Sequence, residues 1–114
     1  MKVLVSGGRD YNNKGKVYDV LDRLHSQRPI EVIVHGGSTG ADALAHQWAE
    51  ERGVLTSVYP ANWKKHGRAA GPIRNRQMLE EEYPHGVVTF AGGPGTRNLI
   101  NEAKKRELPI MFYD

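Results

Sequence analysis

Ala91-Gly92-Gly93-Pro94-Gly95-Thr96 follows the apolar run Val87-Val88-Thr89-Phe90 and precedes a helix-like segment, 97–106. An apolar run of strand length, then glycines, then a threonine able to cap a helix, predicts a strand, a tight turn and a helix start. Glycines let the backbone approach an anion closely, and the first amides of a helix offer it unpaired N–H groups. The stretch therefore predicts a phosphate-binding turn. The alternative is an ordinary strand-to-helix loop that only needs positive φ angles.

The same pattern occurs twice more in the chain. Val3–Ser6 is followed by Gly7-Gly8-Arg9, and Val32–His35 is followed by Gly36-Gly37-Ser38-Thr39-Gly40. Eight of the 13 glycines lie in these three loops. Ligands of open α/β sheets bind outside the carboxyl ends of the strands, so the three loops are expected at one cleft.

Strand and helix patterns alternate along the whole chain. Helices are expected at 14–27, from 41 to just before Gly53, at 73–83 and at 96–106, and strands at 2–6, 30–35, 54–59, 86–91 and 109–113. Residues 60–72 are expected to form one long irregular segment, which in a compact domain is usually functional or disordered. The alternation predicts a single domain over 1–114, a Rossmann-like three-layer α/β/α fold whose five-stranded, mainly parallel sheet carries helices on both faces.

Composition limits the class of protein. The 114 residues are enough for one domain, and the absence of cysteine excludes disulfides, thiolate nucleophiles and thiolate metal sites. The N-terminal apolar run is too short for a signal peptide, and no stretch is long enough to span a bilayer. We therefore expect a cytoplasmic protein without membrane contact.

The positive charge is concentrated in one window. The formal net charge is +3, and residues 60–79 contain five basic side chains and no acid: Lys64, Lys65, Arg68, Arg74 and Arg76. Outside these five, the chain has 11 basic and 13 acidic residues. The basic character therefore indicates a local site more than a general surface property.

Four motifs in order carry a resemblance to a known family: Val34-His35-Gly36-Gly37-Ser38-Thr39-Gly40-Ala41-Asp42, Tyr59-Pro60-Ala61-Asn62-Trp63, Ala70-Gly71-Pro72-Ile73-Arg74-Asn75-Arg76-Gln77-Met78 and Ala91-Gly92-Gly93-Pro94-Gly95-Thr96. Together they resemble the SLOG superfamily, and most closely its short single-domain branch related to YspA, over essentially the whole chain. The resemblance implies a Rossmann-like fold with the first strand central, a nucleotide or nucleotide-derived ligand, and a homodimer. The superfamily includes LOG enzymes, which release a base from a nucleoside monophosphate, DprA proteins, which bind single-stranded DNA, and nucleotide sensors.

The LOG signature Pro-Gly-Gly-x-Gly-Thr-x-x-Glu ends in a catalytic glutamate. Gly92, Gly93, Gly95 and Thr96 match it, but Ala91 replaces the proline and Leu99 stands at the glutamate position. Arg74 and Met78 keep the Arg-to-Met spacing of those enzymes. A leucine can neither transfer a proton nor stabilise an oxocarbenium-like centre, and Glu102 lies one helical turn further on. The resemblance therefore favours binding over catalysis.

Several candidate residues have a structural alternative. Arg74 at a helix start suggests a bound anion, or else a surface arginine paired with Glu81 or Glu82. Asp42 could hold a ribose hydroxyl or only stabilise its helix N-terminus. Trp63 could stack on a base or anchor its loop. The full set of candidate ligand-binding residues is Gly7, Gly8, Arg9, Gly36, Gly37, Ser38, Gly40, Asp42, Trp63, Arg74, Asn75, Gly92, Gly93, Gly95 and Thr96.

These observations predict a domain that binds or senses a nucleotide or a nucleotide-derived ligand through its glycine loops and Arg74. One alternative is a LOG-like N-glycosidic hydrolase of nucleoside monophosphates, in which Arg74 would be catalytic and Glu102 or Asp42 the acid. Another is single-stranded nucleic acid binding. The five histidines lack metal-ligand spacing, so we expect neither a metal nor a cofactor.

Overall fold

The computed structural model describes all 114 residues and contains one five-stranded sheet. Its strands are β1 (Lys2–Ser6), β2 (Val32–His35), β3 (Leu55–Val58), β4 (Gly86–Phe90) and β5 (Ile110–Tyr113). Their order is β3-β2-β1-β4-β5, and every neighbouring pair is parallel. The expected α/β class and the central position of the first strand are confirmed.

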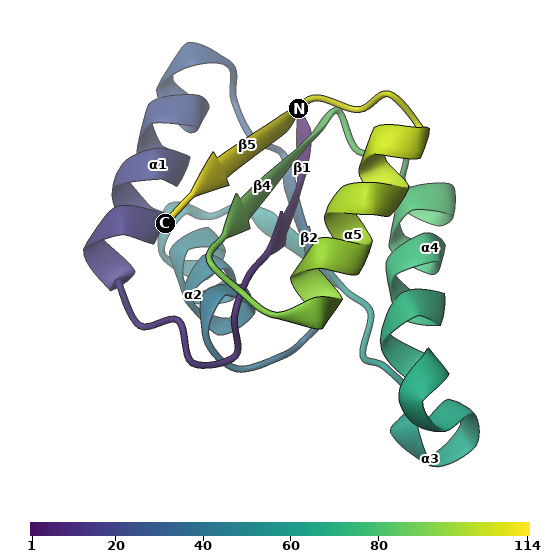
Figure 1. Ribbon diagram of the computed structural model, residues 1–114. Coiled ribbons are helices and arrows are strands. Elements are labelled where there is room, and N and C mark those ends of the chain that lie inside the picture. The colour runs from purple at the N-terminus through teal and green to yellow at the C-terminus, as the bar shows by residue number, and fades with distance from the viewer.

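Helices cover both faces of the sheet. Helices α1 (Lys14–Gln27) and α2 (Ala41–Arg52) lie on one face, and α4 (Ala70–Glu82) and α5 (Pro94–Lys105) lie on the other (Figure 1). Successive side chains of β1 point to opposite faces of the sheet. Val3 and Val5 pack with α1 and α2, and Leu4 between them packs with α4 and α5. The three-layer prediction is confirmed. None of the helices is sufficiently long and apolar to span a bilayer.

The segment 60–72 was expected to be irregular, and this is wrong. It contains the short helix α3 (Trp63–His66), a 3₁₀ turn (Gly67–Ala69) and the beginning of α4 at Ala70. The Asn62 side chain caps α3 by accepting a hydrogen bond from the Lys65 N–H at 3.1 Å. Pro72 falls in the first turn of α4, where a missing N–H removes no intrahelical bond. In Figure 1 this segment projects from the body of the molecule at the foot of α4.

The cap of the last helix also differs from the prediction. Gly93, not Thr96, is the N-cap of α5, and Pro94 is its first residue. Proline suits this position because its fixed φ is already helical and its missing N–H would have been unpaired. Thr96 is consequently the third residue of the helix, within its first turn, where it is buried.

Two glycines with positive φ differ in their surroundings and provide a matched test. Gly53, the C-cap of α2, has φ +70° and open space where a Cβ would lie, whereas a Cβ on Gly40 (φ +75°) would meet the Gly8 carbonyl oxygen and the Arg9 backbone. We predict that Gly53→Ala costs about 1 kcal/mol of unfolding free energy and Gly40→Ala about 3 kcal/mol or more, because only the latter adds a backbone clash to the strained φ. Urea denaturation of both variants measures the difference. Equal losses would contradict this account.

Candidate functional site

The backbone of Gly8 joins the three glycine-containing loops. Its N–H donates to the Ala91 carbonyl at 2.9 Å, and its own carbonyl accepts from the Ala41 N–H at 3.2 Å. The β1–α1 loop is therefore bonded to the β4–α5 turn on one side and to the start of α2 on the other. This arrangement confirms that the loops after β1, β2 and β4 meet at one edge of the sheet.

A cleft of about 790 Å³ lies where these loops meet. Its volume is within the usual range for small-molecule sites, and only three of its 21 lining residues are hydrophobic, which suits a polar ligand. It is lined by most of the candidate residues from the sequence: Gly7, Gly8, Arg9, Ser38, Asp42, Trp63, Arg74, Asn75, Gly92, Gly93, Gly95 and Thr96.

The other candidates lie next to this cleft. Gly36 and Gly37 line an adjoining hollow of about 300 Å³, and Gly40, packed on the Gly8 and Arg9 backbone, lines neither. Sequence reasoning left several lining residues out of the candidate set, among them Asp10, Arg68 and Asn98. Asn98 could have been found from its position two residues after Thr96, because the first turns of a helix that begins at the cleft also face it.

The β4–α5 turn leaves backbone donors free. The N–H groups of Gly92, Gly93, Gly95 and Thr96 donate to no protein atom. A Cβ on Gly93 or Gly95 would meet nothing within 4 Å, so the packing of the protein does not itself require glycine there. Free donors at a helix N-terminus, bordered by open space, form a site suited to an anion.

The β2–α2 loop is occupied from within the protein. The N–H groups of Gly36 and Ser38 donate to the Asp42 carboxylate at 3.1 and 3.3 Å, and the Gly37 N–H donates to His35 Nδ1 at 2.9 Å. The expectation of a phosphate cradle is therefore wrong for these three amides. A carboxylate on the following helix already holds the place that an external anion would take.

Asp42 is almost completely buried, at 5% exposure. Burial raises the pKa of this carboxyl to about 6, although the two backbone donors and the charges of Arg74 and Arg9 act in the opposite direction. Because Asp42 lines the cleft, it is a carboxyl group that can exist in either protonation state near neutral pH at a ligand site.

Arg74 spans the gap between two strand ends. Its Nη1 donates to the Gly36 carbonyl at 2.8 Å and to the Tyr59 carbonyl at 3.3 Å. Arg74 is the fifth residue of α4 and not at its start, so a helix N-terminus does not explain its position. Arg74 does not pair with Glu82 either, because Glu82 binds Lys2, Ser57 and Tyr59. Burial lowers the pKa of Arg74, yet a guanidinium remains charged in proteins.

The arginines of the cleft have no acidic partner. Arg9, Arg68 and Arg74 line the cleft, and none of them forms an ion pair with a carboxylate. Arg76, two residues beyond Arg74, instead approaches Glu102 at 3.9 Å on the far side of α4. The cleft therefore has positive charge available for an anionic ligand.

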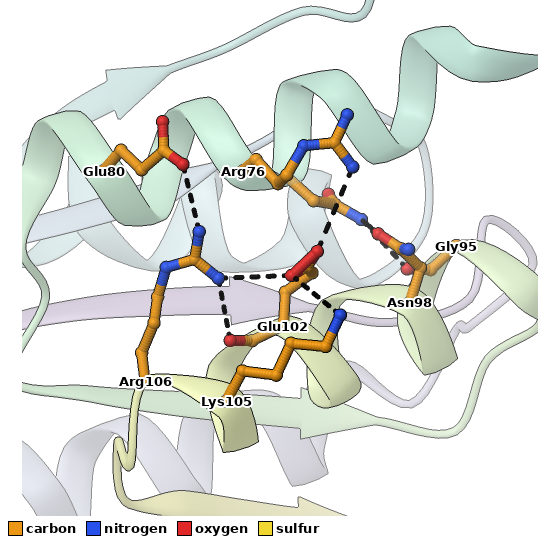
Figure 2. Close-up of polar contacts among 8 residues, drawn as sticks. Arg76, Glu80, Gly95, Asn98, Glu102, Lys105 and Arg106 are labelled. Carbon is orange, nitrogen blue, oxygen red and sulfur yellow. Dashed lines mark hydrogen bonds and ion pairs between the residues drawn. The ribbon is translucent and has the colours of Figure 1, made fainter.

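Helix α5 offers no free acid for a LOG-like reaction. Leu99 is fully buried in the core beside Leu4 and Val34. Glu102 is held by Arg76, Lys105 and Arg106 in the network between α4 and α5 that Figure 2 shows, and it does not line the cleft. Asn98 Oδ1 and the Gly95 carbonyl both accept from the buried Asn75 amide, at 3.0 and 3.1 Å, which joins α4 to the beginning of α5.

Two histidines, His35 and His46, connect the β2–α2 loop to Glu50 on α2 through a chain of polar contacts. His35 Nε2 lies 2.9 Å from His46 Nδ1, and His46 Nε2 lies 2.7 Å from Glu50. Since His35 Nδ1 accepts from the Gly37 N–H, its Nε2 must carry the proton and donate to His46. Burial, together with His46 and Arg74, lowers the pKa of His35 to about 4, so this ring is neutral at pH 7. No group of three or more potential metal ligands exists in the structure.

The raised pKa of Asp42 gives a pH-dependent prediction. Between pH 4 and 6 the folded wild type keeps a proton on Asp42 that the unfolded chain has released, so ionising this group makes wild-type stability fall as pH rises. An asparagine at this position does not titrate and can accept the same two backbone hydrogen bonds. We predict that Asp42→Asn gains about 2 kcal/mol of unfolding free energy relative to wild type between pH 4 and pH 7. Urea denaturation across this range measures the change, and a pH-independent difference would contradict it.

The sequence of this chain is similar to those of known proteins. The profile of the YspA, cpYpsA-related SLOG family matches residues 1–66, which include the loops after β1 and β2. The Gene 61 protein of Mycobacterium phage D29 is 34% identical over 119 residues, an alignment that covers 98% of this chain and 95% of that protein. The chain therefore belongs to the YspA, cpYpsA-related SLOG family.

Proposed function

We propose that the cleft binds a nucleotide or a nucleotide-derived ligand and holds it without turnover. The observation that carries this proposal is the β4–α5 turn, where four backbone N–H groups have no protein partner and face a cleft whose arginines have no acidic partner. A phosphate at this turn would accept several charge-assisted hydrogen bonds from groups that are already in place.

The base of the ligand is assigned to Trp63. This side chain lines the cleft and is 47% exposed, which leaves ring surface free for stacking. Tyr11 also lines the cleft, but it is less exposed than Trp63, its hydroxyl donates to the Asp114 carbonyl at 2.9 Å, and its ring packs on Phe90 within the protein. With the phosphate at the turn, the buried carboxyl group of Asp42 is assigned to a sugar hydroxyl.

Binding without turnover is supported by the two positions on α5 where a LOG-like acid was expected, Leu99 and Glu102. Glycosidic cleavage of the LOG type needs an acid beside the bond that breaks. Leu99 offers none, and Glu102 is neutralised by three cations outside the cleft. The second candidate function is a nucleotide N-glycosidase in which Asp42 supplies the acid, and the pKa of about 6 for Asp42 favours it.

Nucleic acid binding is the remaining alternative. Lys64 and Lys65 on α3 are exposed and form no ion pair, so they could meet a phosphate backbone next to the cleft. Such binding would weaken by roughly one log unit per log unit of salt for each phosphate neutralised. The homodimer expected from relatives stays a prediction.

A proton NMR time course separates these functions. Purified protein is mixed with AMP, CMP, GMP, NAD or ADP-ribose, and spectra are read for line broadening and for free base. Broadening that persists for a day without free base is the expected result. Release of base that Asp42→Asn abolishes would establish the N-glycosidase instead, and absence of broadening with every ligand would overturn the proposal.

The binding site itself is tested by variants of the turn and of Arg74. We predict that Gly95→Ala leaves stability unchanged or slightly higher, because its Cβ meets only open space at a helical position, but weakens nucleotide binding about tenfold by obstructing the phosphate. Arg74→Ala should also weaken binding at least about tenfold through the loss of a charged donor.

Arg76→Ala is the matched control for Arg74→Ala. It removes an arginine of the same helix that faces Glu102 rather than the cleft, so binding should not change. Isothermal titration gives the affinities and thermal unfolding confirms folding. If Arg76→Ala weakened binding as much as Arg74→Ala, the contribution of Arg74 would be a general charge effect.

A further inference from the structure

Arg9 and Trp63 form a contact across the mouth of the cleft. The Arg9 guanidinium carbon lies 5.2 Å from the centre of the Trp63 ring, which is within the range of a cation–π interaction. Both residues line the main cleft and also the adjoining hollow, so the pair stands between the two. No carboxylate holds Arg9 in this position, and its side chain is exposed.

The Trp63 ring is supported on one side by the protein. A Cβ on Gly71 of α4 would lie 3.5 Å from the Trp63 Cη2 atom, so the ring rests close to that helix. Arg9 covers ring surface that the cleft would otherwise expose. A flat base that stacks on Trp63 from the cleft therefore needs the area that Arg9 covers in the free protein.

The backbone of Arg9 is fixed close to the β4–α5 turn. The N–H of its neighbour Gly8 donates to the Ala91 carbonyl at 2.9 Å, and the Arg9 carbonyl accepts from the Thr39 hydroxyl at 3.0 Å. Its side chain can thus exchange Trp63 for the turn by side-chain rotation alone. Burial chiefly raises the pKa of Asp42 and lowers that of Arg74, and the charge of Arg9 acts on both, which places Arg9 within electrostatic reach of the cleft interior.

We propose that Arg9 occupies the base-stacking surface of Trp63 in the free protein and that a bound nucleotide exchanges these contacts. The base takes the place of Arg9 on Trp63, and the released guanidinium binds the phosphate at the β4–α5 turn. This inference rests on the proposed function, and it defines the ligand class further, as one that carries both a stacking base and an anionic group. Removal of Arg9 then has opposite effects on ligands with and without phosphate.

The test compares each nucleoside with its 5′-monophosphate, for adenine, cytosine, guanine and uracil, by isothermal titration. Arg9→Ala should bind the nucleoside about two- to fivefold more tightly, because the competing cation–π contact is gone. The same variant should bind the monophosphate several-fold more weakly, because a charged donor to the phosphate is lost. Trp63→Leu is the matched variant, and it should weaken both ligands equally, roughly tenfold, by removing the stacking surface.

Proton NMR of the arginine Nε–H groups reads the exchange directly. Arg9→Ala identifies the Arg9 signal, which the Trp63 ring current should displace in the free protein, and Trp63→Leu should abolish this displacement. Saturation with the monophosphate should also abolish it. An equal effect of Arg9→Ala on nucleoside and monophosphate, or no effect on either, would overturn the exchange but leave the proposed function intact. Absence of binding by every nucleotide would overturn both.

Discussion

The peptide groups of Gly8 are the constraint on which the cleft depends. Parallel pairing of β1 with β2 and β4 brings three strand ends to one edge, but strands alone do not fix the loops beyond them. Gly8 does so by donating to Ala91 and accepting from Ala41 and Tyr11. A side chain at Gly8 would press on the Ala91 carbonyl, and one at Gly40 on Gly8 itself. Close backbone contact of this kind is available only to glycine.

The glycine-rich loops after β2 and β4 differ in whether their backbone N–H groups have partners within the protein. The loop after β2 is closed by Asp42 and His35, which accept its first three N–H groups. The turn after β4 retains its donors. The amides of the loop after β2 are thus bonded within the protein, to Asp42 and His35, whereas those of the turn after β4 have no protein partner. Arg74, anchored to the carbonyls of Gly36 and Tyr59, adds positive charge between them.

The side chains of helix α5 point to different surroundings according to their position along the helix. Leu99 and Ala103 lie four residues apart and both enter the core, whereas Glu102 turns toward α4. There its carboxylate pairs with three basic side chains, of which Arg106 Nη1 is nearest, 3.2 Å from Glu102 Oε2. Its charge joins two helices, and it has no route to the cleft. The acids that do line the cleft, Asp10 and Asp42, come from the loop after β1 and from α2 rather than from α5, which carries the glutamate in the LOG signature.

The local sequence by itself determined the strands, four long helices, the layer arrangement and the three loops at one sheet edge, since hydrophobic periodicity and glycine placement are properties of neighbouring residues. Most residues that line the cleft followed from those loops. Tertiary structure alone decided that Asp42 accepts from the loop after β2, that Arg74 binds backbone carbonyls, that Arg76 pairs with Glu102, and that 63–72 is helical. These outcomes depend on which groups separated in sequence become neighbours, and the direction of a side chain from its helix reveals this only after the helices are packed.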